Sequence, residues 1–201
     1  RQLDHMSTIY LVRHGITLAN MENRFAGRTD EELHPEGREQ IRQVGERLRN
    51  SSIKAIYCGP AKRTMQSAEI LGVLLNIPFQ ALAELDEILI PHWDGLTKEQ
   101  ISKQYGAQYP TWLAAPQTFN LNGCETLEQV QTRAVGAVNR LLSESRGRDF
   151  LVVSHLIVLR CLVLYYQGQD IKDFRSIKIG NGSILKLSAE EGRMPFSCSF
   201  F

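Results

Sequence analysis

The sequence predicts an α/β fold: a three-layer sandwich with a mainly parallel central sheet, helices on both faces and a small helical cap insertion. Two observations carry this prediction. Short apolar runs typical of buried strands alternate along the chain with longer segments whose apolar residues recur at helical spacing. The segment from about 88 to 147 contains helical patterns but no clear strand, which indicates an insertion over one end of the sheet.

In the first half of the chain, strands and helices alternate. The apolar runs at 8–12 and 53–58 are expected to be strands, and 79–82 is a shorter strand candidate. The segment 35–50 begins with proline and carries its apolar residues on one face, which predicts a helix. The segment 61–75 shows the same spacing and predicts the next helix.

The second half continues the alternation after the predicted cap helix at 97–105. The segment 125–143 carries apolar residues in helical register. A strongly apolar strand is predicted at 150–153, followed by a helix at about 157–166. The end of the chain, 183–187 and 195–200, predicts two strands joined in a hairpin.

The composition is that of an ordinary globular protein, with 43% hydrophobic and 22% charged residues. The 23 Lys and Arg residues balance the 22 Asp and Glu residues, so the net charge favours neither nucleic acid nor an anionic membrane as a partner. The longest apolar run, at 156–166, is interrupted by Arg160 and is shorter than the roughly 20 residues that span a bilayer. We expect a single domain over 6–201, preceded at 1–5 by a remnant of cloning.

The cysteines give a prediction of location and exclude some kinds of site. The four cysteines are far apart and form no Cys-x-x-Cys pair, which suits reduced cytosolic thiols rather than a disulfide framework or a zinc site. The chain shows no basic and then apolar signal segment, so we expect a cytoplasmic protein. Without a His-Glu-x-x-His motif or an acidic cluster, we expect no metal and no cofactor.

An Arg-His-Gly triplet, Arg13 to Gly15, directly follows the first predicted strand. The guanidinium of Arg13 supplies paired donors that match phosphate oxygens. The imidazole of His14 is a nitrogen nucleophile that is partly neutral at physiological pH. Gly15 allows a tight turn. Because open α/β sheets bind ligands at the carboxyl ends of their strands, this placement predicts a phosphate site that contains a nucleophile.

Three further motifs carry polar residues that suit the same chemistry. Arg63 falls in the first turn of the helix opened by Pro60, where it adds donors beside amides that already attract anions. His155 follows the strand at 150–153, as His14 follows the first strand. A carboxyl group from the segment 85–95 could donate the proton that the leaving oxygen of a phosphoryl transfer needs.

Together these stretches resemble the histidine phosphatase superfamily, in its phosphoglycerate mutase-like branch 1 of small members. The resemblance covers nearly the whole chain, and the motifs come in the family's order. They are Arg-His-Gly-x-Thr-x-x-Asn at 13–20, Pro-x-x-Arg-x-x-Gln at 60–66, Glu-x-x-x-x-x-Trp-x-Gly at 87–95 and Ser-His at 154–155. The segment 24–37 and the Gly-Cys-Glu-Thr-Leu stretch at 123–127 are also similar to the family.

The resemblance implies roles for individual residues. It implies that His14 takes the phosphoryl group and that Glu87 first protonates the leaving alcohol and then activates water. The implied clamp on the phosphoryl oxygens consists of Arg13, Arg63 and His155. Further implied phosphate contacts are Asn20, Gly27 and Leu156. Two guanidiniums and an imidazolium can neutralise the charge of a phosphoryl transition state without a metal.

Phosphatase and mutase members of the family differ in the charge around the site. Lys98 stands where the mutases carry a lysine, but Ile-Leu-Ile at 88–90 replaces their Arg-His-Tyr, and 111–115 lacks their paired arginines. Between 88 and 132 the only cations are Lys98 and Lys103, which predicts an apolar rim and an uncharged or partly apolar leaving group. We therefore expect a metal-independent phosphomonoester phosphatase that acts on a small phosphorylated metabolite through a phosphohistidine.

Two alternatives stay open. One is a cofactor-dependent mutase; the other is a weakly active or non-catalytic binding protein, which is suggested by Leu156 where many members carry glycine. Other departures from the family pattern, at Ile16, Gly59 and Pro91, are expected to affect the choice of substrate and the rate, but not the type of reaction. The expected partner is a small phosphoester, not nucleic acid or a membrane, and a homodimer is left open.

Overall fold

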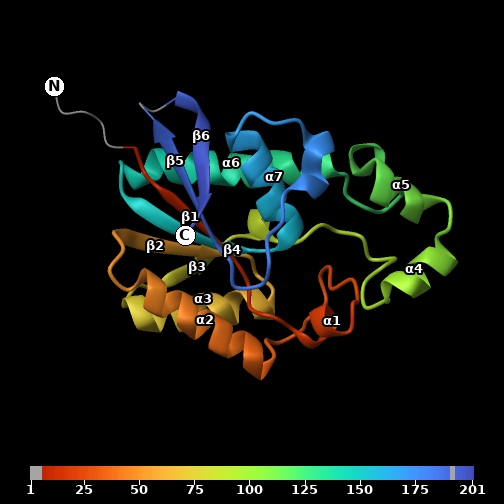
Figure 1. The fold of residues 1–201 in the computed structure, drawn as a ribbon, viewed down its shortest axis with the longest axis horizontal. Coiled ribbons are helices and arrows are strands. Elements are labelled where there is room, and N and C mark those ends of the chain that lie inside the picture. Colours follow the sequence, from red (N-terminus) through yellow and green to blue (C-terminus); the bar gives the residue numbers. More distant parts are fainter. Residues whose placement is uncertain (1–5, 191–192) are drawn as a thin grey trace.

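The computed structural model describes residues 6–190 and 193–201. Its centre is a six-stranded sheet with the strand order β3-β2-β4-β1-β5-β6 (Figure 1). The first four of these strands pair in parallel, and β5 and β6 form the antiparallel hairpin at the end of the chain. The strands are β1 (Ile9–Arg13), β2 (Ile53–Cys58), β3 (Phe79–Ala81), β4 (Asp149–Ser154), β5 (Ile184–Glu190) and β6 (Arg193–Phe200). The predicted mainly parallel sheet is confirmed; the prediction for 1–5 lies outside the described residues.

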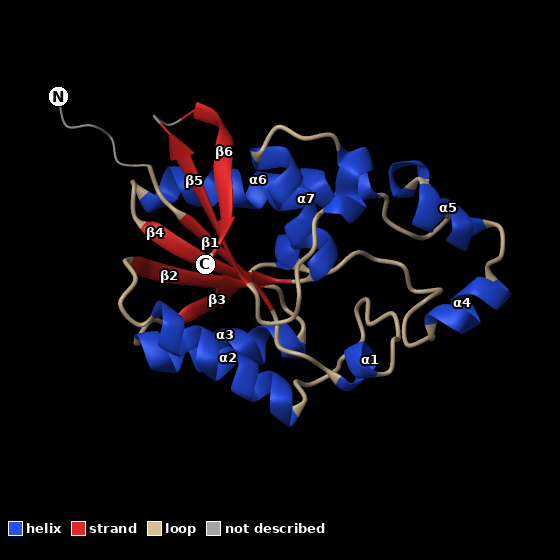
Figure 2. Cartoon of the chain, in the orientation of Figure 1, coloured by secondary structure: helices blue, strands red, loops and turns tan. Residues whose placement is uncertain are grey.

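Helices cover both faces of this sheet (Figure 2). One face is covered by α2 (Pro35–Leu48) and α3 (Lys62–Leu75), and the other by α6 (Leu127–Ser145) and α7 (Leu156–Tyr166). Thr126 begins α6 with a capping box, since its hydroxyl accepts from the Gln129 amide while the Gln129 side chain accepts from the Thr126 amide. The predicted three-layer sandwich is therefore confirmed.

The alternating side chains of β1 connect the two helical layers. Ile9 and Leu11 pack into the core shared with α6 and α7, whereas Tyr10 and Val12 pack into the core shared with α2 and α3. This two-sided burial explains why the strand is a continuous apolar run. At Arg13 the apolar run ends, so the polar residues that follow emerge at the carboxyl edge of the sheet.

Two short helices, α4 (Lys98–Gln104) and α5 (Gln108–Ala114), extend beyond the carboxyl ends of the parallel strands (Figure 1). Trp93, which is fully buried, holds this cap together by packing against a cluster of other aromatic rings. These rings are Phe25, Tyr105, Tyr109, Trp112 and Phe119. The insertion predicted at 88–147 also contains α6, but α6 packs with α7 on the sheet. The segment beyond the strand ends is thus shorter than expected.

The shortest elements were not predicted from the sequence. These are α1 (Leu18–Met21), α5 and the 3-10 helices η1 (Ala83–Leu85), η2 (Pro116–Thr118) and η3 (Ile171–Ser176). Helices of one or two turns carry too few apolar repeats to produce a periodic pattern. In the part of the chain that the structure describes, no helix has the length and apolar character needed to cross a membrane.

Candidate active site

Two histidines meet because β1 and β4 are neighbours in register. Arg13 of β1 lies opposite Ser154 of β4, so the residues that follow, His14 and His155, leave the sheet side by side. The His14 amide donates to the Ser154 carbonyl over 3.1 Å. The centroids of the two imidazole rings are 5.1 Å apart, and the residues are only 3% and 0% exposed. The parallel pairing thus places two imidazoles at one point of the sheet edge.

The contacts of the His14 ring determine which nitrogen is free. Its Nδ1 lies 2.8 Å from the Gly15 carbonyl oxygen. Because a carbonyl only accepts hydrogen bonds, Nδ1 carries the hydrogen of the neutral ring and Nε2 keeps its lone pair. Burial lowers the pKa of His14 well below its ordinary value of 6.5, and the charge of Arg63 lowers it further. The ring is therefore neutral at physiological pH, as a nitrogen nucleophile must be.

Two glycines allow backbone segments to approach these histidines. A Cβ atom at Gly15 would lie 2.4 Å from the Gly37 carbonyl oxygen, so the turn after β1 packs directly on the start of α2. At Gly59 a Cβ atom would lie 2.7 Å from the Leu85 carbonyl oxygen and 3.3 Å from His155 Nε2. The departure from the family pattern at Gly59 therefore makes room for the segment that precedes Glu87.

Backbone carbonyls hold the two arginines of the site. Arg13 Nη1 donates to the Ile179 carbonyl over 2.7 Å. Arg63, which is 1% exposed, donates from Nη1 to the Thr29 carbonyl over 2.9 Å and from Nη2 to the Gly27 carbonyl. These contacts fix the guanidiniums without neutralising their charge. The four side chains described so far, hereafter the phosphate centre, are Arg13, His14, Arg63 and His155.

Several buried polar atoms of the phosphate centre have no partner among the described residues. They are the Nε atoms of Arg13 and Arg63 and both ring nitrogens of His155. Buried polar groups in folded proteins are nearly always hydrogen-bonded. Unpaired donors that gather at one place, beside two guanidiniums, indicate a site for an anion.

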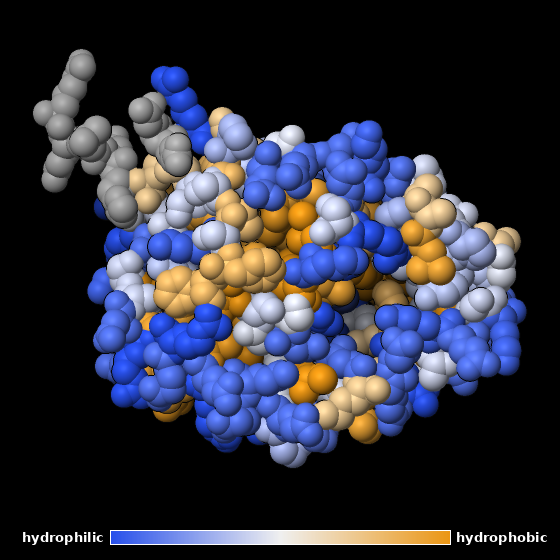
Figure 3. Space-filling view, viewed as in Figure 1, coloured by the Kyte–Doolittle hydropathy of each residue, from blue (hydrophilic) through white to orange (hydrophobic). Residues whose placement is uncertain are grey.

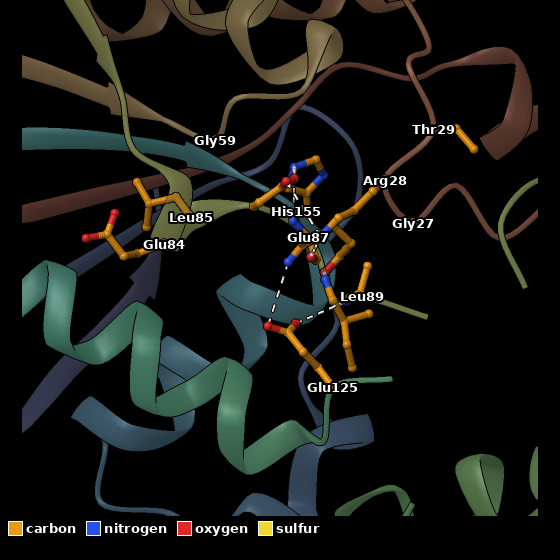
Figure 4. Close-up of polar contacts among 12 residues, drawn as sticks. Gly27, Arg28, Thr29, Gly59, Glu84, Leu85, Glu87, Leu89, Glu125 and His155 are labelled. Atoms are coloured by element: carbon orange, nitrogen blue, oxygen red, sulfur yellow. Dashed lines mark hydrogen bonds and ion pairs between the residues drawn. The ribbon is translucent and has the colours of Figure 1, made fainter. Parts of the chain in front are cut away.

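Glu87 follows η1 and is 7% exposed. Its carboxylate accepts from the Ile88 amide over 2.8 Å. Burial raises the pKa of Glu87 above its ordinary value, and this amide and nearby arginine charges offset the rise only in part. The competing carboxylate of Glu84 points away from the site (Figure 4) and pairs with Arg140 at 3.2 Å. Of these two acids, Glu87 is the one with a raised pKa at the site.

A network of charged side chains holds the backbone around Glu87 (Figure 4). Arg28 and Arg133 donate to the Glu87 carbonyl over 3.0 and 3.1 Å. Arg133 also binds the Glu125 carboxylate through two bonds of 2.9 Å, and that carboxylate accepts from the Leu89 amide over 3.0 Å. No role was predicted for these arginines from the sequence. The family-like stretch at 123–127, which contains Glu125, was the available signal.

One cavity of about 280 Å³ joins these groups. Figure 3 shows the molecule hollowed beside the part that carries α4 and α5, with hydrophilic residues over much of the rim. All eight predicted site residues line this cavity: Arg13, His14, Asn20, Gly27, Arg63, Glu87, His155 and Leu156. Within 6–190 and 193–201, no group of three or more His, Cys, Asp or Glu side chains is arranged to hold a metal ion.

Asn20 and Leu156 have structural positions as well as lining the cavity. The Asn20 side-chain oxygen accepts from the Thr17 amide over 3.1 Å as part of the capping box of α1, and it also accepts from Asn181 over 3.1 Å. Leu156 is the first residue of α7. This position accommodates the bulky side chain, since His155 still lies in register with His14.

The prediction of an apolar rim from 88–132 holds only in part: Ile101, Trp112 and Leu113 line the cavity. Ile88 and Ile90, in contrast, are fully buried in the core, and neither of them lines the cavity. The cavity is also lined by the cations Arg24, Lys98, Arg160 and Arg175. Three of them come from segments outside 88–132, which the charge count did not cover. The one available signal was Arg160, which interrupts an otherwise apolar helix.

Comparison with known proteins identifies the family. A family model described as histidine phosphatase superfamily (branch 1) matches residues 9–198. The chain belongs to this superfamily. Phosphoserine phosphatase 1 of Hydrogenobacter thermophilus is 26% identical over 188 residues, which are 94% of this chain and 89% of that protein. A probable phosphoglycerate mutase GpmB of Salmonella choleraesuis is 33% identical over 193 residues, 94% of this chain and 87% of that protein.

Solved structures agree with this assignment. The structure of Bacillus stearothermophilus YhfR matches with a TM-score of 0.90 and 28% identity over 96% of each chain. An alpha-ribazole phosphatase from Shigella flexneri shares the fold, with a TM-score of 0.84 and 20% identity over 96% of this chain and 94% of that chain. Within its superfamily, the chain is a phosphoric monoester hydrolase. The alternative of a non-catalytic binding protein is therefore set aside.

Proposed function

We propose that this hydrolase is a metal-independent phosphomonoester phosphatase that transfers the phosphoryl group of a small metabolite to His14 and then to water. The observation that carries the proposal is the state of the phosphate centre. A neutral imidazole with a free Nε2 lies beside two guanidiniums and a second imidazole. In the described chain, the Nε atoms of both guanidiniums and both nitrogens of that second ring lack partners. This is the arrangement that nucleophilic attack on a bound phosphate requires.

In the first step, His14 Nε2 attacks the phosphorus atom in line with the leaving oxygen. The N–P bond forms as the bond from phosphorus to the alcohol oxygen breaks. The carboxyl group of Glu87 gives its proton to that oxygen, so the alcohol leaves neutral. The raised pKa of Glu87 supports this role, because it keeps more of the group protonated near neutral pH.

Charge on the transferred phosphoryl group is stabilised by Arg13, Arg63 and His155. A phosphoryl transition state needs mainly positioning and charge neutralisation. The arginines are already fixed by backbone carbonyls, so little reorganisation is needed when the phosphate binds.

In the second step, water completes the cycle. The Glu87 carboxylate takes a proton from water as the water oxygen attacks phosphorus. The new O–P bond forms, the N–P bond to His14 breaks, and phosphate leaves. His14 is again neutral and Glu87 is again protonated, so the proton balance closes.

Names of similar proteins support the class of reaction rather than one substrate. They include a phosphoserine phosphatase, an alpha-ribazole phosphatase and a glucosyl-3-phosphoglycerate phosphatase. The leaving alcohols of these three differ widely in size and charge. A cytoplasmic location remains an expectation from the sequence, and a homodimer is left open.

Mutase activity is the second candidate, and Lys98 is the observation that favours it. Lys98 lines the cavity at the position where the mutases carry a lysine. Probable phosphoglycerate mutases are also among the relatives. Incubation with 3-phosphoglycerate and 2,3-bisphosphoglycerate separates the two, because a mutase releases the 2-phospho isomer and a phosphatase releases inorganic phosphate.

The test of the phosphatase proposal is hydrolysis of p-nitrophenyl phosphate in excess chelator. We expect turnover in the parent protein and a loss of at least about a thousandfold in His14→Ala. His92→Ala is the matched control, since His92 is exposed and does not line the cavity. Quenching the parent in alkali, where phosphohistidine is stable, after mixing with p-nitrophenyl phosphate radiolabelled at phosphorus should also trap radioactive phosphate on His14. Equal turnover in the parent and His14→Ala would contradict the proposal.

A further inference from the structure

The cavity carries more positive charge than one phosphate group requires. Among the described residues that line it, six are Arg or Lys and only Glu87 has a carboxyl group. Arg13 and Arg63 belong to the phosphate centre. Arg24 is neutralised by Glu22, whose carboxylate accepts from Arg24 Nε over 2.6 Å. The three remaining cations, hereafter the cationic subsite, are Lys98, Arg160 and Arg175.

Arg160 is held rigidly on α7 and is 9% exposed. Its Nε donates to the Ile177 carbonyl over 2.7 Å, and its guanidinium carbon lies 4.8 Å from the centroid of the Phe174 ring. The two Nη groups have no acceptor within the described chain. Burial and the charge of Arg175 lower the pKa of Arg160 to about 10, so it stays charged at neutral pH. Its outer nitrogens can therefore bind a carboxylate or phosphate with two bonds.

The other two cations come from the cap and from η3. Arg175 donates from Nε to the Leu113 carbonyl over 3.0 Å and from Nη2 to the Trp112 carbonyl over 2.6 Å, which ties η3 to α5. Lys98 is the exposed first residue of α4. Desolvation where its side chain lines the cavity, and the charges of Arg13, Arg175 and Arg160, lower the pKa of Lys98. The three cations therefore affect one another across the same cavity.

No counterion from the protein compensates this charge in the described part of the chain. None of the three cations has a carboxylate oxygen within 4.0 Å there. Like charges gathered in a partly buried cavity repel one another. A bound anion relieves that repulsion and gains charge-assisted hydrogen bonds.

We propose that the cationic subsite binds a second anionic group, so that the preferred substrate is a phosphomonoester whose alcohol carries a carboxylate or another phosphate. This inference rests on the proposed function, because it requires the first phosphate to bind at the phosphate centre. The cavity of about 280 Å³ leaves room for a short carbon chain between the two anions. The proposed leaving group is therefore anionic, whereas the sequence predicted an uncharged or partly apolar one.

A matched pair of ligands tests the proposal. 3-Phosphoglycerate and glycerol 3-phosphate have the same carbon skeleton, but the first has a carboxylate where the second has a neutral alcohol. We would measure the inhibition constant of each against p-nitrophenyl phosphate and expect 3-phosphoglycerate to bind at least about tenfold more tightly. Propane-1,3-diol bisphosphate, compared with its monophosphate, shows whether a second phosphate is preferred to a carboxylate.

Variants then assign the preference to the subsite. Lys98→Met should reduce the ratio of the two inhibition constants several-fold while leaving the constant for glycerol 3-phosphate nearly unchanged. Arg175→Gln should act in the same direction. Lys103→Met is the control, since Lys103 lies on the same helix, is exposed and pairs with Glu99 at 2.9 Å. Because Lys98 is exposed, its replacement is not expected to impair folding.

The outcomes separate the two proposals. Equal inhibition constants in the parent protein overturn the anion subsite, even if p-nitrophenyl phosphate is hydrolysed. A preference that persists in both Lys98→Met and Arg175→Gln overturns the assignment to these residues. If p-nitrophenyl phosphate is not hydrolysed at all, the proposed phosphatase fails. Dissociation constants from calorimetry, measured on the same ligand pair, then still decide whether the subsite exists.

Discussion

The two halves of the cavity are built in different ways. The phosphate centre takes its histidines from the ends of two paired strands and Arg63 from the first turn of the adjoining helix α3. The cationic subsite takes its residues from α4, α7 and η3, which have no strand pairing to align them. Sheet register positions the two histidines of the first set. The arginines of both sets are held by separate bonds from side chains to carbonyl groups.

This difference indicates a division of labour. Groups fixed by the sheet are suited to the chemical step, because the reacting atoms must be held precisely in place. Groups on the cap and on peripheral segments can change without disturbing that step, so they are suited to selecting the alcohol. A substitution in the phosphate centre should therefore impair all substrates equally, and one in the cationic subsite should impair only anionic alcohols.

The largest expected effect comes from Arg63→Met. We expect kcat/KM to fall by about 10³ to 10⁵ for p-nitrophenyl phosphate, 3-phosphoglycerate and glycerol 3-phosphate alike, because the lost guanidinium stabilises charge on the transferred group. Steady-state kinetics on the three substrates measure this. Lys62→Met is the control, since Lys62 is the exposed neighbour of Arg63 on α3 and pairs with Asp30 at 3.0 Å. A loss of kcat/KM confined to 3-phosphoglycerate would contradict the assignment of different roles to the two halves of the cavity.

Glu87→Gln should reduce steady-state turnover by about 10² to 10⁴ and change its kinetic form. Glutamine can neither protonate the leaving oxygen nor activate water. p-Nitrophenolate leaves without protonation, so the variant should release a burst of one p-nitrophenol per active site and then turn over slowly. Glycerol 3-phosphate, which needs the proton, should give no burst. Rapid-mixing absorbance measurements check the first result, and a burst with both substrates would exclude Glu87 as the acid.

The sequence predicted the phosphate centre because its signals are local. An apolar strand followed by Arg13 and His14, and a second strand followed by His155, place both histidines at one edge of a parallel sheet. Strand burial and parallel pairing follow from composition and connectivity, which are visible in one sequence. The order of the motifs then identified the family, and Glu87 followed from its spacing to Trp93.

The cationic subsite was not predicted because it depends on tertiary packing alone. Arg160 and Arg175 are distant in sequence from Lys98, and no motif links them. The scarcity of cations over 88–132 predicted an apolar rim, but within that segment Ile88 and Ile90 turn into the core. An apolar run next to a site can face either the core or the ligand, and periodicity does not distinguish the two over three residues.

Arg133→Met should have a smaller effect on activity, of about tenfold, because Arg133 positions Glu87 rather than contacting the substrate. Its bonds to the Glu87 and Glu84 carbonyls and to Glu125 connect α6 to the segment that carries the acid. We expect the rate of phosphoryl transfer to His14 to fall more with glycerol 3-phosphate than with p-nitrophenyl phosphate, because only glycerol 3-phosphate needs the proton. A purely structural role would reduce both rates equally. Arg140→Met is the control, because Arg140 lies on the same helix and contacts the Glu84 carboxylate instead.

The smallest expected effect is a change in stability with pH, which distinguishes the phosphate centre from the cationic subsite. The pKa values of His14 and His155 are both lowered well below 6.5 by burial, so these rings stay neutral in the folded protein. As pH falls below about 6.5, the unfolded chain takes up protons that the folded chain does not, and the free energy of unfolding decreases. Each histidine contributes at most about 1.4 kcal/mol per pH unit in this range.

The contribution of Glu87 to the pH dependence of the free energy of unfolding has the opposite sign. Its raised pKa stabilises the folded protein at low pH, and that contribution is lost as pH rises through the folded pKa. Comparison of variants therefore isolates the histidines. Between pH 6.5 and 5.5, His155→Asn should lose less of its free energy of unfolding than the parent, by up to about 1.4 kcal/mol. Urea unfolding at both pH values measures this. Lys98→Met should follow the parent, since a lysine and two arginines stay charged throughout this range. If His155→Asn lost as much stability as the parent, the buried imidazole would not be held neutral, and the pH response would not distinguish the phosphate centre from the cationic subsite.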